Sequence, residues 1–110
     1  MTRKPGEPLE HDIQGAILKY LTIKRIFHYR QNTGAAKFGK SFVKFGVKGA
    51  PDIVCVIKGQ YVGLEIKAKD GEQSQAQFNF QVQLEAAGGT YLLCYSLEDV
   101  IQGLERKAAL

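Results

Sequence analysis

Apolar residues recur at helical spacing near the start of the chain. From about Leu9 to Arg25 they fall every three or four positions, the period of an α-helix with one buried face. The apolar positions are Ile13, Ala16, Ile17, Tyr20 and Leu21. The pattern predicts an amphipathic helix. Before it, residues 1–8 are expected to form a frayed tail, because prolines and a glycine there oppose regular structure.

Four apolar segments have strand character. Residues 26–30 alternate between apolar and polar, and residues 52–57 (DIVCVI) are almost continuously apolar, as in a central strand buried on both faces. The segment Lys58-Gly59-Gln60 is a tight-turn signal that leads into a returning strand at 61–67. A further apolar strand is predicted at 90–95.

Two more helices complete the pattern. Ser74 is the predicted N-cap of a helix over 75–87, with Gly88 as its stop, and Ser96 caps a final helix that runs to about Lys107. The order helix-strand-strand-strand-helix-strand-helix indicates an α/β fold, a mixed β-sheet core flanked by helices. At 110 residues the chain is expected to form a single domain.

The segment 31–49 is long for a connection in a compact domain. Four glycines are interspersed with Lys37, Lys40, Lys44 and Lys48 and with Phe38, Phe42 and Phe45. The glycines oppose a stable helix, and a flexible hairpin is one possibility. The spacing also suits one or two amphipathic turns, so the sequence leaves this structure open.

Charged residues stand at the ends of the two strands that the turn joins. If Lys58-Gly59 is the two-residue turn, Asp52 lies opposite Glu65, and if Gly59-Gln60 is the turn, Asp52 lies opposite Lys67. Opposed side chains are about 5 Å apart, and residues two apart on a strand share a face. Either register therefore gathers Asp52, Glu65 and Lys67 at the open end of the hairpin.

Two carboxylates at this distance repel each other, and a cation between them would offset that repulsion. Lys67 alone could serve, but hard oxygen ligands suit Mg²⁺ or Mn²⁺, which support phosphodiester hydrolysis. The alternative is structural, because a lone Asp at a strand start often caps a turn and Glu-x-Lys often forms a cross-strand ion pair. Glu10 at the first helix and Gln77 have structural alternatives as well, the first with the helix dipole and the second in a capping box with Ser74.

The uneven distribution of charge along the chain bears on the kind of partner that the protein binds. The net charge is +4, but residues 1–50 carry 10 basic and 3 acidic side chains, whereas residues 51–110 carry 5 basic and 8 acidic ones. A basic half favours a polyanion, and a solvated basic face is the alternative. The apolar runs are too short for a membrane span, and Cys55 and Cys94 lie inside such runs. The basic residues at the start have no apolar segment behind them, so we do not expect them to act as a secretory signal. We therefore expect no membrane partner, no small-molecule cofactor and a reducing, cytoplasmic compartment.

These motifs together resemble a known family. Gly49-Ala50-Pro51-Asp52 followed by Glu65-Ile66-Lys67 looks like the PD-(D/E)XK nuclease signature. The surrounding residues make the chain similar to the VRR-NUC branch of that restriction-endonuclease-like superfamily, in its stand-alone phage or bacterial form. They are Glu10 in the first helix, Arg30-Gln31-Asn32-Thr33-Gly34, Ser74-x-x-Gln77 and Ala87-Gly88-Gly89. The resemblance covers about residues 9–104.

The resemblance implies a role for each matching residue. Asp52, Glu65 and the backbone carbonyl of Ile66 would bind the metal, and Lys67 would be the catalytic lysine. Glu10 would support the metal from the first helix, through a water molecule, and Gln77 would approach from the second helix. The implied activity is a metal-dependent DNA endonuclease in the cytoplasm of a bacterium or a phage-infected cell.

Small members of this branch resemble Holliday-junction resolvases, which implies a homodimer acting on branched DNA. A less selective duplex, flap or nick nuclease and a non-catalytic DNA-binding module remain alternatives. The candidate phosphate contacts are Arg30, Lys37, Lys40, Lys44 and Lys48. The phenylalanines of 31–49 would bury against the core or a second subunit, or would wedge against exposed bases.

Overall fold

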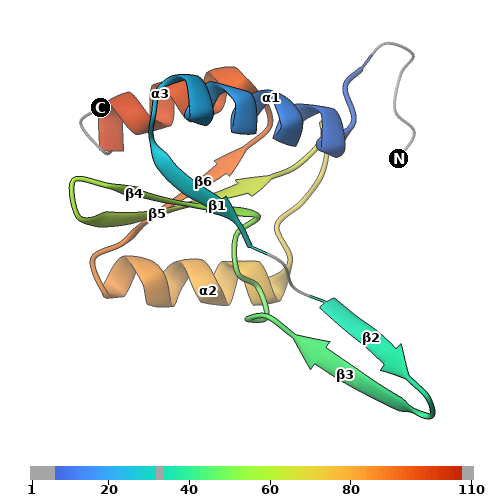
Figure 1. Cartoon of the computed structure of the whole chain (residues 1–110). Helices are drawn as coiled ribbons and strands as arrows, with labels where there is room; N and C mark the ends of the chain where they lie inside the picture. The colour runs from blue at the N-terminus through green and yellow to red at the C-terminus, as the bar shows by residue number, and fades with distance from the viewer. Residues whose placement is uncertain (1–6, 32–33, 108–110) are drawn as a thin grey trace.

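The computed structural model describes residues 7–31 and 34–107 (Figure 1). The predicted tail therefore lies outside the described residues except for its last two positions, and Asn32 and Thr33 lie outside them as well. The elements in chain order are α1 (Glu10–Ile23), β1 (Phe27–Arg30), β2 (Gly34–Phe38), β3 (Ser41–Phe45), β4 (Ile53–Ile57), β5 (Gln60–Ile66), α2 (Gln75–Ala86), β6 (Thr90–Cys94) and α3 (Leu97–Lys107).

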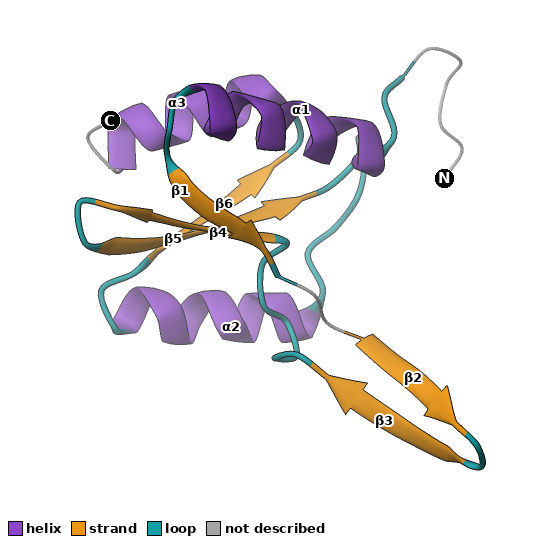
Figure 2. Ribbon diagram, in the orientation of Figure 1, coloured by secondary structure: helices purple, strands orange, loops and turns teal. Residues whose placement is uncertain are grey.

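A mixed four-stranded sheet in the order β1-β4-β5-β6 forms the centre of the molecule. β4 pairs antiparallel with both β1 and β5, whereas β5 and β6 are parallel and are joined through α2. Figure 2 shows α1 and α3 on one face of the sheet and α2 on the other. This arrangement confirms the predicted α/β class and the mixed sheet flanked by helices.

The main core lies between the sheet and the layer of α1 and α3. Ile13, Ile17 and Leu21 of α1 are buried, as the helical pattern predicted, but Ala16 is exposed. Their partners are the side chains of β4, β5 and β6 that point to this face, together with α3 residues Val100 and Leu104. Burial of these apolar side chains is the main favourable term that holds the layers together.

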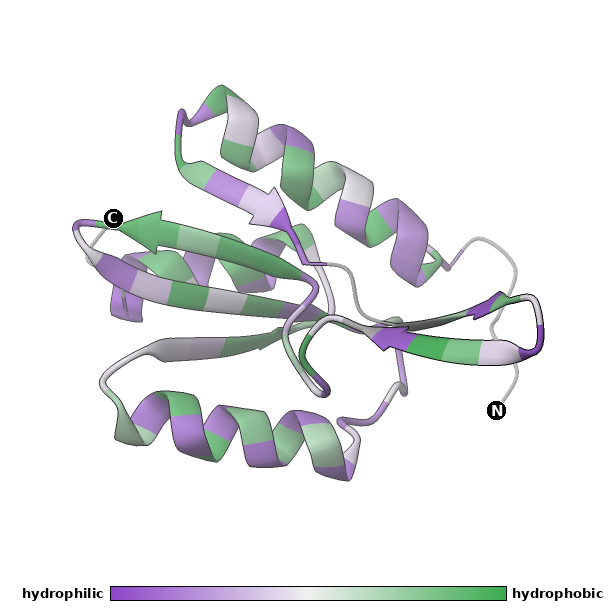
Figure 3. Ribbon diagram, turned by 60° about the horizontal axis from the view of Figure 1, so that its bottom comes forward, coloured by the Kyte–Doolittle hydropathy of each residue, from purple (hydrophilic) through white to green (hydrophobic). Residues whose placement is uncertain are grey.

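The other face is less completely covered. α2 contains no fully buried residue, and Figure 3 shows polar and apolar positions mixed around it. Its half-buried side faces the sheet through residues such as Gln77, Phe80 and Leu84, while Phe78 and Val82 are each 50% exposed. α2 therefore gains less from burial than α1 does and depends more on its N-terminal cap.

The turn between β4 and β5 fixes the register of that hairpin. Lys58 and Gly59 have φ angles of 52° and 81°, and Ile57 pairs with Gln60. Positive φ at both central residues is the geometry of a type I′ turn, which matches the twist of antiparallel strands. Ile53 consequently pairs with Leu64, which sets Asp52 opposite Glu65 rather than Lys67. The first of the two predicted registers is confirmed.

Segment 31–49, left open by the sequence, contains a second hairpin. β2 and β3 pair antiparallel as a two-stranded sheet of their own, with Phe38 opposite Ser41 across the turn. Figure 1 shows the hairpin projecting from the end of the main sheet. The element order predicted from the sequence thus lacks these two strands. Among the described residues, no helix is long and apolar enough to cross a membrane.

Candidate active site

The candidate site lies at one end of the main sheet, where β4 begins and β5 ends. α1 and α2 also begin at this end (Figure 1). A helix N-terminus carries partial positive charge and unpaired backbone N–H groups, so two of them favour an anionic ligand nearby. The fold therefore brings two strand ends and two helix starts to one place.

Asp52 is held by backbone contacts on both sides. Its Oδ2 accepts a hydrogen bond from the Ile66 N–H of β5 at 2.8 Å, and its own carbonyl accepts one from the Gln31 N–H at 2.8 Å. Asp52 thus fastens the start of β4 to the end of β5 and to the residue after β1. Its carboxylate also interacts with that of Glu65, whose pKa it raises.

Glu65 is the most deeply buried charged residue among those described, with 2% of its surface exposed. Its Oε2 accepts a hydrogen bond from Gln77 Nε2 at 2.9 Å and lies 3.8 Å from Lys67 Nζ. Its Oε1 is buried and makes no hydrogen bond with the described residues. Burial first, and then the negative charge of Asp52, raises the pKa of Glu65 to about 8.

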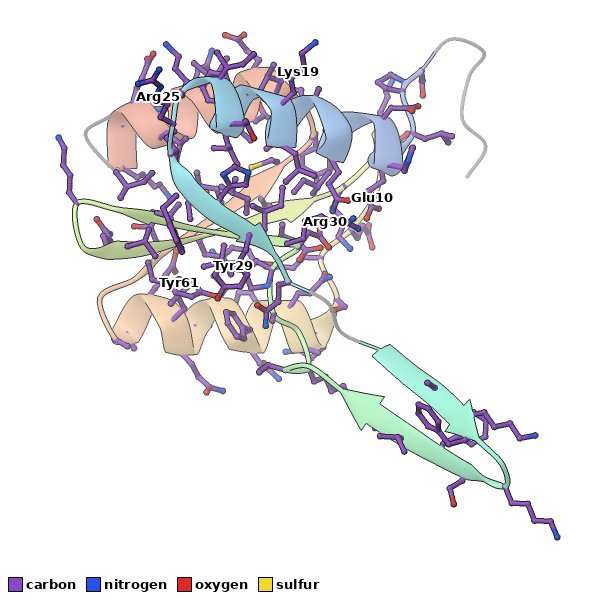
Figure 4. All side chains as sticks on the ribbon, in the orientation of Figure 1. Glu10, Lys19, Arg25, Tyr29, Arg30 and Tyr61 are labelled. Carbon is purple, nitrogen blue, oxygen red and sulfur yellow. The ribbon has the colours of Figure 1, made fainter. Side chains whose placement is uncertain are left out.

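Glu10 interacts electrostatically with Asp52 and Lys67, although it belongs to α1, which lies on the other face of the sheet from α2. Partial burial and the charge of Asp52 raise the pKa of Glu10, while Lys67 acts in the opposite direction. Figure 4 shows Glu10 at the first turn of α1, on the side of the molecule where β1 ends. Glu10 is exposed, so its carboxylate is accessible from solvent.

Gln77 combines the two roles that the sequence left as alternatives. Its Oε1 accepts the Ser74 N–H at 2.8 Å, and Ser74 Oγ accepts the Gln77 N–H at 3.1 Å, which completes the predicted capping box. Its Nε2 is directed to Glu65 at the same time. A single amide side chain therefore caps α2 and contacts the buried carboxylate.

Two glycines, Gly49 and Gly63, allow close packing of the segment that leads into Asp52. Gly49 has a φ of 82°, and a Cβ at this position would overlap the backbone carbonyl of Ala76 in α2. Two residues later, Pro51 packs against Gly63 of β5, where a Cβ would come within 2.6 Å of its ring. These contacts link residues far apart in sequence, and the only signal for them was the glycines themselves.

The basic candidates divide into two groups. Arg30 is exposed at the end of β1, where its backbone lies opposite Ile53, the residue after Asp52, and Lys48 is exposed shortly before Asp52. Lys37, Lys40 and Lys44 are exposed on the hairpin. Phe38 and Phe42 are exposed there too, at 64% and 74%, so neither ring is buried against the core of its own chain.

The carboxylates of the candidate site can be compared with the ligands that a divalent cation requires. Within the ranges 7–31 and 34–107, no three His, Cys, Asp or Glu side chains form a ready-made metal cage. Mg²⁺, however, commonly takes only one or two carboxylates and fills its remaining positions with water and phosphate. Burial and then repulsion by Asp52 raise the pKa of Glu65, and a cation at its unpaired oxygen would offset both effects, so the residues present fit one.

Comparison with known proteins supports the architecture. No family model and no curated protein matches the chain. A solved structure described as a VRR_NUC domain superposes with a TM-score of 0.64 at 16% sequence identity, over 89% of this chain and 96% of that one. The likeness shows that the two chains share their fold, which in the described residues of this chain consists of three helices around a mixed four-stranded sheet, with the β2–β3 hairpin beside it.

Proposed function

We propose that this protein is a divalent-metal-dependent DNA endonuclease that hydrolyses phosphodiester bonds. The observation that carries the proposal is the buried carboxylate of Glu65, with one oxygen unpaired, beside Asp52 and Lys67 at an open end of the sheet. A buried carboxyl oxygen without a hydrogen-bond partner is costly to keep in a purely structural role. The likeness to a VRR_NUC domain supports the same conclusion.

In this proposal Asp52, Glu65 and the Ile66 carbonyl bind the cation, and Glu10 contacts it through water. A bound Mg²⁺ or Mn²⁺ supplies charge stabilisation at the phosphate and lowers the pKa of water. Glu65 must be ionised for this role, and Gln77 favours the ionised form by donating to Oε2. Asp52 keeps its position because Ile66 N–H holds one of its oxygens.

Lys67 provides the positive charge of the site. Its side chain is 17% exposed, so it is largely desolvated while it remains close to the surface. Nζ offsets negative charge on the scissile phosphate and orients the attacking water, and its ion pair with Glu65 restricts its position. A neutral side chain of similar length would lose both effects.

The basic side chains hold the nucleic acid. Arg30 and Lys48 flank the carboxylates along the chain, and Lys37, Lys40 and Lys44 extend the basic surface along the hairpin. Phosphate contacts of this kind position DNA without reading its sequence and weaken as salt rises. We further propose that the substrate is branched and that the protein cuts it as a homodimer of the stand-alone phage or bacterial type, because a two-fold dimer presents two sites to two symmetry-related strands.

Cleavage of a labelled four-way junction tests the proposal. Duplex DNA of the same sequence runs beside it, with Mg²⁺ and with chelator, for the wild type, Lys67→Ala and Lys19→Ala. Lys19 is an exposed lysine on the outer side of α1 and serves as the matched control (Figure 4). We expect paired, Mg²⁺-dependent cuts in the junction that Lys67→Ala abolishes without loss of binding and that Lys19→Ala preserves.

Other outcomes distinguish the alternatives. Equal cutting of duplex, nicked and flapped DNA would keep the site and remove the selectivity for junctions. Tight binding that ignores Mg²⁺, with no cleavage under any divalent ion, would make the cluster structural and the protein a DNA-binding module. Cleavage by Lys67→Ala at the wild-type rate would contradict the proposed site.

A further inference from the structure

The β2–β3 hairpin has two chemically different faces. Directly opposed residues of an antiparallel pair point to the same side. Ala36 and Val43 form one such pair, next to Phe38 and Ser41, whereas Lys37 and Phe42 form a pair on the other side. Lys44 lies on that second side as well. One face is therefore mainly apolar and the other is basic.

The apolar face of the hairpin is uncovered in the single chain. Phe38 is 64% exposed and Val43 is 46% exposed. Within the described part of the chain neither strand joins the main sheet, and Figures 1 and 3 show the hairpin extending away from it. A two-stranded hairpin is marginally stable by itself in water, so this one requires a surface to pack against.

A second uncovered apolar surface lies on the main sheet, on the side of α2. Phe27 pairs with Val56 across β1 and β4, so both point to one face, and Tyr29 follows on the same face. The three side chains are 66%, 40% and 47% exposed in the order Phe27, Val56 and Tyr29. The rings of Phe27 and Tyr29 meet edge to face at 6.4 Å, and Figure 4 shows Tyr29 on the α2 side of the sheet. α2 packs on the β6 side of the sheet and leaves this end open.

We propose that two copies of this chain cover these surfaces reciprocally, so that the apolar hairpin face of each copy packs on the exposed sheet surface of the other. The apolar face of one hairpin packs on Phe27, Tyr29 and Val56 of the partner, and the exchange is reciprocal, which is a closed two-fold arrangement. This inference deepens the proposed function, since it rests on the homodimer proposed there and assigns its interface. The basic face remains exposed for phosphate and lies beside the partner's β1, the strand that ends at Arg30.

The exposed area is of the size that a dimer needs. At roughly 200 Å² for a fully exposed aromatic side chain, the open fractions of Phe27, Tyr29 and Phe38 amount to about 350 Å² per copy and about 700 Å² for two. The two valines and the hairpin backbone add to this, and a specific interface requires about 1,000 Å². DNA is the less suitable occupant of the apolar face, because that face carries no cation among its described side chains.

The oligomeric state of two matched double variants tests the exchange. Phe38→Glu with Val43→Glu places charge on the apolar face, and Lys37→Glu with Lys44→Glu places the same charges on the basic face of the same hairpin. We expect sedimentation velocity to show a dimer for the wild type and the second variant. The first should be a monomer, with a dissociation constant raised about 100-fold or more. Phe27→Glu should match the first variant from the receiving side.

A disulfide between copies tests the pairing itself. Val43→Cys is mixed with Phe27→Cys and oxidised, and we expect a covalent dimer that either variant alone forms much less. Cys55 and Cys94 are buried and will not interfere. A monomeric wild type, a dimer that survives Phe38→Glu with Val43→Glu, or no cross-link would overturn the exchange. Junction cleavage measured in parallel separates the two ideas: a monomer that still cuts DNA contradicts only the interface, and a dimer that never cuts contradicts only the nuclease.

Discussion

Gln77 connects the cap of α2 to the buried carboxylate of Glu65. Its Nε2 donates to Glu65 Oε2 at 2.9 Å while its Oε1 accepts the Ser74 N–H at 2.8 Å. The amide can do both because it has a donor end and an acceptor end. The start of α2 and the candidate site are therefore coupled through a single side chain.

Replacing this residue should affect stability and the site together. Gln77→Ala removes the capping acceptor and leaves Glu65 Oε2 without its amide donor, so we expect a loss of about 1–3 kcal/mol in the free energy of unfolding. Ser74→Ala removes the cap alone and should cost about 0.5–2 kcal/mol. Urea unfolding of both variants measures the difference.

Activity separates the two variants more clearly. We expect Gln77→Ala to cleave DNA poorly and Ser74→Ala to keep most of its cleavage, because only the first change touches Glu65. Equal activity in the two variants would mean that the contact with Glu65 matters for folding only.

The raised pKa of Glu65 predicts how the stability of the metal-free protein depends on pH. An ordinary glutamate has a pKa near 4.5, and burial beside Asp52 raises that of folded Glu65 to about 8. The folded state therefore holds a proton that the unfolded chain releases above pH 4.5. This contribution to stability is complete below 4.5 and disappears as pH rises through about 8.

Glu65→Gln is the matched control for this effect. The amide cannot titrate, so its unfolding free energy should vary less between pH 5 and pH 8 than that of the wild type in chelator. Added Mn²⁺ should stabilise the wild type more at pH 8 than at pH 6, since binding must displace the proton, and should do little for the variant. A wild-type profile that parallels Glu65→Gln would contradict the proton on Glu65.

Buried thiols give an independent measure of folding. Burial raises the pKa of Cys55 to about 11 and that of Cys94 to about 12, so both remain protonated and shielded at pH 8. A thiol reagent should label neither in the folded protein and both in urea, whereas Ser41→Cys on the exposed hairpin should react at once. Rapid labelling of the native protein would show that β4 or β6 opens readily.

Local patterns predicted the central hairpin because everything that fixes it is nearby in the sequence. The turn signal Lys58-Gly59-Gln60 and the apolar runs on either side were enough to gather Asp52, Glu65 and Lys67, while the choice between the two registers came from the structure. The same holds for the cap of α2, where Ser74 and Gln77 lie three residues apart. The roles of Asp52, Glu65 and Lys67 stay predictions, since geometry alone does not measure catalysis.

The sequence patterns could not predict contacts between residues that are far apart in the chain. Periodicity leaves the parallel pairing of β5 with β6 undetermined, and nothing local indicates that Gly49 lies against Ala76. The hairpin of 31–49 was only one of the possibilities that the sequence left open, because its glycines and lysines are also typical of a loop, and the alternating faces of Phe38 and Lys37 distinguish it only once the strands are known.

Gly49 offers the most direct test of how the site is positioned. Its φ of 82° resembles the 81° of Gly59, but a Cβ would overlap Ala76 at Gly49 and would meet open space at Gly59. Gly59→Ala should therefore cost only the backbone strain of about 1–2 kcal/mol. Gly49→Ala should cost more in urea unfolding and should reduce cleavage as well, since moving residue 49 away from α2 shifts Pro51 and Asp52. If the two variants lose the same stability and Gly49→Ala retains full cleavage, the packing of this loop on α2 does not position Asp52.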